Sequence, residues 1–265
     1  MGYLGNQITT VFPTSISVDS ATVSDDITVD TSTLKVDSTN NRVGIGTASP
    51  EENLEVSHAT APAIQLNRTN DGGFKSILRQ QGNDFEIRGS SGSTKIYTGN
   101  ADGDSSTARL IIDANGHVTM PSQSAFRAHK ASGVSQFNIG SSATTVTFGG
   151  EIFDTNSDYD ATTDTFTAPV DGTYLLHYAL RLQSIDSASS YYNINLSTSN
   201  RGYNSIFSND RWSADLTYWT PMRTVIADMD AGDTAHVEIL FNGGTAQTDI
   251  SGSSNYTVFS GCLIG

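Results

Sequence analysis

The chain has 265 residues, a formal net charge of −14 and a single cysteine, Cys262. An acidic surface repels phosphate backbones, which argues against nucleic acid as a partner, and one cysteine cannot form an intrachain disulfide. No apolar run approaches the length of a membrane span, and the N-terminus shows no secretory signal, so we expect synthesis in a cytoplasm as a soluble protein.

The first part of the chain contains short stretches of alternating apolar residues. Each pair is spaced by two, which places both side chains on one face of a strand; the pairs are Ile16/Val18, Ile27/Val29, Leu34/Val36 and Val43/Ile45. Strands this short bury too little apolar surface to offset the backbone entropy lost on folding. Winding identical chains together would supply neighbours and cover bare strand edges, although other subunits could do the same. We therefore expect a slender homotrimeric β shaft.

A weak internal repeat supports such a shaft. Residues 36–47 and 112–120 both read as a strand, a turn rich in Asp and Asn, and a second strand, and a proline closely follows each copy. Asn115-Gly116 is a strong hairpin signal because both residues tolerate positive φ. The string at 41–50, followed by Leu54-Glu55-Val56, resembles a segment that recurs in the tail fibres of bacteriophages.

Longer and more regular alternation begins at Phe126. Two predicted strands illustrate it, with apolar faces formed by Tyr174, Leu176, Tyr178, Leu180 and Leu182 in one and by Ala235, Val237, Ile239 and Phe241 in the other. Polar residues occupy the alternate positions, so each strand has one buried and one outward face. Turns rich in Gly and Asp join the strands, which is typical of a β-sandwich.

The same segment resembles the trimeric jelly-roll head shared by the globular heads of complement's first component and tumour necrosis factor. The resemblance starts at Phe126, includes the run from Phe166 to Tyr174 and ends with the run from Phe259 to Gly265. It implies a TNF-like β-sandwich whose core motif comprises Phe126, Phe166, Pro169, Gly172 and Tyr174. Pro169 would fix φ at a strand edge and Gly172 would permit a tight turn. We expect Cys262 to be a small buried residue of the terminal strand.

These observations predict an all-β homotrimeric fibre with a short β shaft and a C-terminal jelly-roll head. Residues 1–36 would attach to other phage tail proteins, residues 37–125 would form the trimeric shaft, and residues 126–265 would form the head. The resemblances imply a phage tail fibre, located in the virion, whose head binds a glycan or protein of the host cell surface.

One run of oxygen-bearing side chains has the spacing of a cation site. Asp154, Asn156, Asp158 and Asp160 stand at every second position, and oxygen ligands so placed can wrap a calcium ion. However, Tyr159 occupies the position at which an EF-hand loop needs Gly, and the resemblance explains Asn156 and Asp160 as strand and turn residues. Calcium is therefore one of two interpretations, and no other cofactor is expected.

An aromatic-rich stretch is the candidate receptor-binding surface. Aromatic faces stack on sugars and arginine holds acidic groups, and the candidates are Tyr191, Arg201, Tyr203, Arg211 and Trp212. Aromatic residues also fill jelly-roll cores and trimer axes, which is the alternative for each of them.

The sequence contains no Gly-x-Ser-x-Gly nucleophile motif, and we expect a non-enzymatic protein. Three alternatives to receptor binding stay open. The head could serve only to trimerise the fibre or to dock another virion protein. Paired carboxylates could make the chain a polysaccharide depolymerase. The chain could also be a secreted bacterial adhesin with the same head.

Overall fold

The computed structural model describes residues 27–29, 33–68, 74–89, 92–98, 107–209 and 212–265. Every regular element in these residues is a β-strand, which confirms the predicted all-β class. None of the described residues forms a helix long and apolar enough to span a bilayer. The chain divides into two units, residues 1–94 with 112–117 and residues 95–111 with 118–265. The predicted strand at Ile16/Val18 and most of the segment 1–36 lie outside the described residues.

The first sheet contains the first copy of the internal repeat. In spatial order its strands are β1 (Ile27–Val29), β2 (Leu34–Asp37), β3 (Arg42–Ile45) and β4 (Leu54–Val56). The pairs β1–β2 and β2–β3 are antiparallel, whereas β3 and β4 are parallel. Asn41 adopts a φ of 55° just before β3, a left-handed conformation that Asn tolerates better than most residues. The strand–turn–strand prediction for residues 36–47 is confirmed by β2 and β3.

Two three-stranded sheets follow. The first is an antiparallel meander of β5 (Ala63–Arg68), β6 (Phe74–Gln81) and β7 (Asp84–Gly89). The second contains β8 (Thr94–Tyr97), β9 (Ala108–Ile112) and β10 (Val118–Thr119), in the spatial order β10-β9-β8. The connection from β9 to β10 contains the predicted hairpin signal, but only Gly116 there has a positive φ, 87°. The Asp113 carboxylate holds the connection by accepting the backbone N–H groups of Asn115 at 2.8 Å and His117 at 2.9 Å. The loop is therefore longer than the two-residue turn that Asn-Gly implies.

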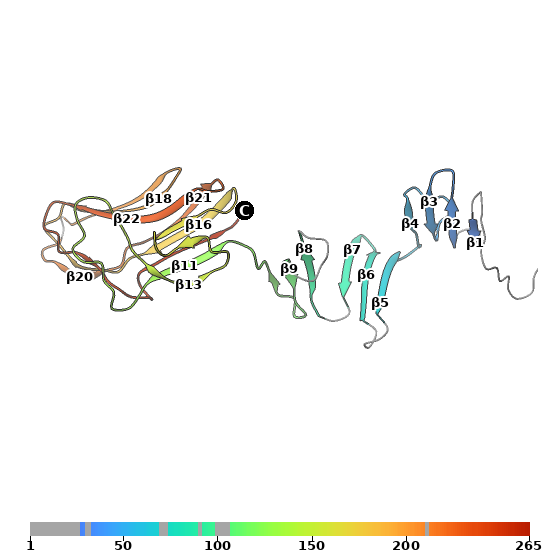
Figure 1. Cartoon of the computed structure of the whole chain (residues 1–265), viewed down its shortest axis with the longest axis horizontal. Helices are drawn as coiled ribbons and strands as arrows, with labels where there is room; N and C mark the ends of the chain where they lie inside the picture. Colours follow the sequence, from blue (N-terminus) through green and yellow to red (C-terminus); the bar gives the residue numbers. More distant parts are fainter. Residues whose placement is uncertain (1–26, 30–32, 69–73, 90–91, 99–106, 210–211) are drawn as a thin grey trace, which may run out of the picture. The chain divides into compact units, whose positions relative to one another are not determined.

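The head consists of two main antiparallel sheets and a small third one (Figure 1). The five-stranded sheet has the order β13 (Gly149–Asp154), β11 (Ala125–Lys130), β24 (Val258–Leu263), β16 (Gly172–Ala179) and β21 (Met222–Met229). The six-stranded sheet has the order β14 (Tyr159–Asp160), β15 (Thr165–Thr167), β22 (Thr234–Asn242), β18 (Tyr191–Thr198) and β19 (Gly202–Ser208), with β12 (Thr144–Thr145) paired to β22. The small sheet contains β20 (Leu216–Trp219), β17 (Leu182–Ile185) and β23 (Asp249–Ile250).

The first and last strands of the head are neighbours. β11 pairs with β24 along its length, and the Thr173 N–H donates to the carbonyl of Gly265 at the C-terminus. Strands that are far apart in the sequence are thus held side by side, as Figure 1 shows for β11, β16 and the C-terminal end. This pairing joins both ends of the head in one sheet.

The hydrophobic core of the head receives side chains from both large sheets. The residues of both predicted apolar faces are at most 4% exposed, which confirms their burial. The first predicted strand is interrupted after Ala179, however, and Leu182 begins β17 in the small sheet. The ring of Phe126 stacks on Tyr159 and Phe166 at centroid distances of 5.2 and 4.7 Å, and it meets Phe259 edge-on at 5.0 Å. Burial of these large apolar surfaces is the main stabilising contribution to the head.

Two residues of the predicted core motif have different roles from those expected. Pro169 is exposed, so its side chain is not part of the core. Gly172 does not have the positive φ of a tight turn; instead, a Cβ there would lie 2.7 Å from Leu263 Cδ1 and 2.9 Å from the Gly265 carbonyl oxygen. Glycine is required at 172 because the C-terminal strand packs closely against it. Phe126, Phe166 and Tyr174 are buried as predicted.

Cys262 is not fully buried, contrary to the prediction. It lies in β24, is partly exposed and pairs across the sheet with the exposed Leu175. Residues paired directly across two strands point to the same face, so the thiol belongs to the outward face of the five-stranded sheet.

Candidate functional site

The end of β16 brings an arginine to the surface between two aromatic rings. The backbone N–H of Arg181 donates to the Thr257 hydroxyl at 3.2 Å, and its carbonyl accepts the Ser251 N–H at 2.8 Å. The guanidinium carbon lies 4.2 Å from the ring centroid of Tyr218 in β20 and 5.1 Å from that of Tyr256, which precedes β24. We call these three side chains, Arg181, Tyr218 and Tyr256, the Arg181 surface.

The Arg181 surface is accessible to a ligand. Tyr218 is 53% exposed and Tyr256 is 51% exposed. Within the described part of the chain, no hydrogen bond or ion pair joins the guanidinium of Arg181 to another side chain, so its N–H donors are available. A guanidinium presents a planar set of donors that matches carboxylate, sulfate or phosphate oxygens, and Tyr and Arg commonly dominate binding surfaces. The arrangement can therefore hold an acidic ligand between aromatic faces.

A pair of tryptophans and a polar contact lie next to Tyr218 in the sequence or across the sheet. Trp219 follows Tyr218 in β20, is nearly half exposed, and has its ring centroid 6.0 Å from that of Trp212. Gln183 pairs with Tyr218 across the sheet, and its amide donates to the Asp249 carboxylate at 3.3 Å. Tyr218 and Trp219, being consecutive in the strand, point to opposite faces of the small sheet.

An open hollow of about 420 Å³ lies at the same small sheet and is lined by Ser184, Asp215, Leu216, Thr217 and Gln247. The Asp215 carboxylate accepts the Ser187 N–H at 2.9 Å and the Gln247 amide at 2.7 Å, and the pKa of Asp215 is lowered mainly by that Ser187 N–H. The Thr245 N–H in the same way lowers the pKa of Asp186. Glycoside cleavage needs a carboxylic acid with a raised pKa. Asp186 and Asp215 have the opposite property, because their hydrogen bonds lower their pKa values.

The structure disperses the residues predicted to bind a receptor. One terminal nitrogen of the Arg201 guanidinium donates to the Asp228 carboxylate at 2.7 Å. Tyr203 and Trp212 are partly buried against the hydrophobic core, and Tyr191 is partly buried in β18. Arg211 lies outside the described residues. None of the described residues of this group belongs to the Arg181 surface, and a receptor role for them stays a prediction.

The residues predicted to hold calcium have separate protein partners. The Asp154 carboxylate accepts the backbone N–H groups of Asp158 at 3.1 Å and Tyr159 at 2.8 Å. Asp160 accepts the Thr162 N–H at 2.8 Å, and this bond is the main cause of its lowered pKa. Among the described residues, no three His, Cys, Asp or Glu side chains are grouped so that they could hold a metal ion. These contacts explain the spacing without an ion, and calcium binding stays a prediction.

Two facing antiparallel sheets with an aromatic, cationic edge define this part of the chain as a jelly-roll binding module. The family model described as the C1q domain matches residues 125–264, and the chain belongs to this family. No curated protein matches the sequence.

Several solved structures are similar to the head. The globular domain of a zebrafish complement 1qA protein has 18% identity and a TM-score of 0.38, with 54% of this chain and 98% of that chain covered. Murine APRIL has 16% identity and a TM-score of 0.40, with 54% of this chain and 99% of that chain covered. The Eiger TNF of S. frugiperda has 6% identity and a TM-score of 0.40, with 54% of this chain and 94% of that chain covered. C1q- and TNF-like domains are generally non-catalytic binding modules and typically form homotrimers.

The sequence pattern gave no reason to single out Arg181, which lies in the short connection between β16 and β17. Tyr218 lies 37 positions further along the chain and Tyr256 lies 75 positions further. Their approach depends on the pairing of β17 with β20 and of β16 with β24. A single sequence carries no local signal for such long-range pairings.

Proposed function

We propose that the chain is a trimeric fibre of a bacteriophage virion whose head attaches the particle to a host cell surface. The observation that carries the proposal is the guanidinium of Arg181, unpaired within the described residues and held between two half-exposed tyrosines on a C1q-family head. The likeness of residues 41–56 to phage tail fibres supports the virion location. Residues 1–36 would join the fibre to other tail proteins.

An exposed apolar face supports trimerisation through the head. Leu175, Met222 and Ile226 are exposed, and Leu175 pairs with Ile226 across the five-stranded sheet. Apolar residues grouped on an outward face favour contact with another protein, and a rotational axis lets identical faces cover one another. A trimer would present three Arg181 surfaces, so weak single contacts would combine into tight attachment.

A binding experiment with the full chain tests the proposal. Fluorescently labelled protein is titrated onto a panel of bacterial strains and onto an array of neutral and acidic glycans. Where the unaltered chain binds, Arg181→Gln and Tyr256→Ala should each weaken binding by about tenfold or more, the effect expected of a central contact. Arg223→Gln is the matched control, because the guanidinium of Arg223 donates to the Asn204 carbonyl and to the Ser205 hydroxyl at 3.3 Å, and it should leave binding unchanged.

Each other outcome points to a different function. Equal binding by Arg181→Gln and the unaltered chain would refute the Arg181 surface, and a change of oligomeric state in this variant would assign Arg181 to a subunit interface. A trimer that binds no strain or glycan would favour the purely structural fibre. Loss of viscosity in a host polysaccharide solution would establish a depolymerase instead.

A further inference from the structure

The meander β5–β7 has one face made of large apolar side chains. The register places Ile64, Leu78 and Ile87 in one row across the three strands, and it places Phe85 opposite Gln80 in the next row. Residues in register and two apart along a strand share a face. The five large apolar residues of this face are 45 to 71% exposed: Ile64, Leu66, Leu78, Phe85 and Ile87. We call these five residues the meander face.

The opposite side of the same sheet carries an ion-pair cluster. Arg79 pairs with Glu86 across β6 and β7, with 2.6 Å between the guanidinium and a carboxylate oxygen, and Arg88 lies 3.8 Å from the same carboxylate. Gln65, next to Leu66 in β5, is exposed on this side as well. A sheet that is charged on one side and apolar on the other normally has one face in water and one against protein.

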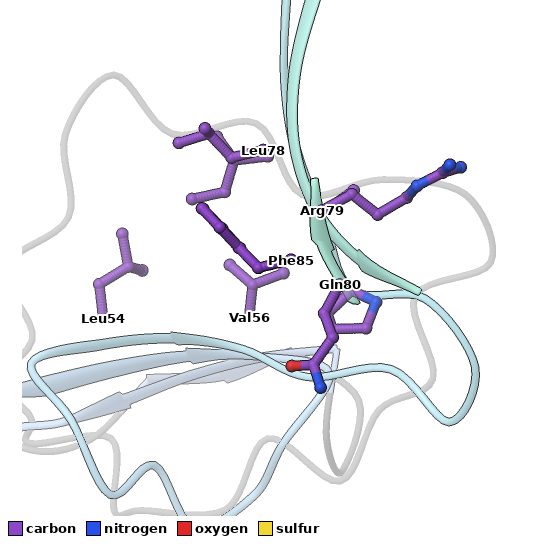
Figure 2. Close-up of a pocket in the computed structure, with 9 residues that line it drawn as sticks. Leu54, Val56, Leu78, Arg79, Gln80 and Phe85 are labelled. Carbon is purple, nitrogen blue, oxygen red and sulfur yellow. The ribbon is translucent and has the colours of Figure 1, made fainter. Parts of the chain in front are cut away.

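A groove extends the meander face. It has a volume of about 300 Å³, and Leu54 and Val56 of β4 line it together with Ile64, Leu78 and Phe85. Figure 2 shows Leu78 and Phe85 pointing from the sheet toward Leu54 and Val56, whereas Arg79 points away on the other side of its strand. The groove can therefore receive apolar side chains from outside the sheet.

The described residues of the chain do not supply a cover for this face. Before Phe126, Ala108 is the sole buried residue of the Ala, Val, Leu, Ile, Met and aromatic types in the described ranges. Five large apolar side chains on one small sheet exceed the scattered exposure that needs no explanation. In the described part of the chain, the meander face is therefore open to another protein surface.

The charge distribution favours other copies of the same chain as this cover. The whole chain has a net charge of −14, but residues 63–89 contain four Lys and Arg against three Asp and Glu. Identical chains can approach here without the repulsion that their acidic parts produce. The five side chains of the meander face are uncharged, which suits a rotational axis, because an axis brings each residue close to its own copies.

We propose that three copies of the chain pack their meander faces against one another around a threefold axis and so form an apolar core inside the shaft. C1q-family heads typically trimerise, and chains already held together at the head have a high effective concentration for this second contact. The proposal goes beyond host attachment and holds whether or not the Arg181 surface binds a receptor.

Photo-crosslinking in the full chain identifies what covers the face. Phe85 is replaced by the photoreactive analogue p-benzoylphenylalanine, and the same analogue at Gln65, on the charged side, is the matched control. Trimers are formed from a mixture of light and nitrogen-15-labelled chains, so that mass spectrometry separates links between chains from links within one chain. We expect Phe85 to link to residues 54–89 of a different copy and Gln65 to give at least about tenfold less of this product.

A link from position 85 to the head, to another segment of its own chain or to a different protein would overturn the proposal, and so would equal linking from positions 85 and 65.

A second pair of variants tests the same face without the bulky analogue, which could itself alter the packing. Ile87→Lys should accelerate amide hydrogen exchange in β6 by about tenfold or more, because three buried charges would open the core, whereas Gln65→Lys should leave it unchanged. Equal exchange in both variants would contradict an apolar core at this face.

Discussion

Asp164 is 5% exposed, and one of its carboxylate oxygens accepts three hydrogen bonds that join separate parts of the head. The donors are the backbone N–H of Phe148 at 2.7 Å, the backbone N–H of Gly149 at 3.0 Å and the hydroxyl of Tyr159 at 3.1 Å. Removing the carboxylate leaves these donors without an acceptor in a region that water reaches poorly. We therefore expect substitution of Asp164 to destabilise the head strongly.

The magnitude depends on the backbone as well as on the hydrogen bonds. An unpaired buried donor costs about 1–3 kcal/mol, and because Gly149 is exposed and its N–H can turn to water, we expect a total of about 3 kcal/mol for Asp164→Gly. Asp164 has a φ of 54°, which glycine adopts freely, whereas Asp164→Ala should cost about 1 kcal/mol more. Asp164→Asn keeps an acceptor and should cost less than either.

Thermal unfolding of the full chain at one fixed protein concentration measures these effects. For a domain of this size, about 3 kcal/mol corresponds to a decrease in Tm of roughly 10 °C. Asp230→Ala is the control, because Asp230 is exposed, and a surface change of this kind should alter stability by less than about 0.5 kcal/mol. A Tm for Asp164→Gly equal to that of Asp230→Ala would refute the reasoning.

Three further predictions concern pH and close backbone contacts. Burial lowers the pKa of His177 from its ordinary 6.5, so the unfolded chain binds more protons than the folded chain just below pH 6.5. The head should therefore lose stability as the pH falls below 6.5. His177→Gln should flatten the curve of Tm against pH in this range. Gly172→Ala should lower the free energy of unfolding by about 1–3 kcal/mol, because the Cβ of the new alanine would lie 2.9 Å from the Gly265 carbonyl oxygen. A melting scan should therefore show a lower Tm, and an unchanged Tm would contradict this. Gly46→Ala would place a Cβ against the Ser57 carbonyl at a φ of 79°, so limited proteolysis should cut near β3 and β4 faster while the Tm of the head stays constant.

Alternation with a period of two made the core strands of the head predictable. Tyr174 and Val237, for example, stand at positions where the sequence alone distinguishes a buried face from an outward one, and both are fully buried. Period-two patterning is a local property, and each strand displays it independently of its neighbours. The all-β class and the faces of β16 and β22 therefore followed from the sequence.

Features that depend on pairing between distant strands could not be predicted in this way. The close contact between Gly172 and the C-terminal strand arises because β16 and β24 are neighbours, and the sequence around 172 suggested a turn instead. The Arg181 surface likewise needs three segments to meet. The exposure of Cys262 depends on which face of β24 is outward. The small residues around Cys262 alternate too weakly in polarity for the sequence to identify that face.

The solution mass of the full chain, measured by light scattering after size exclusion, tests the central claim most directly. A trimeric fibre predicts the mass of three chains of 28.2 kDa each, with no dependence on concentration in the micromolar range. The mass of one chain would contradict the account, because a monomer would leave both the outward face of the five-stranded sheet and the meander face uncovered.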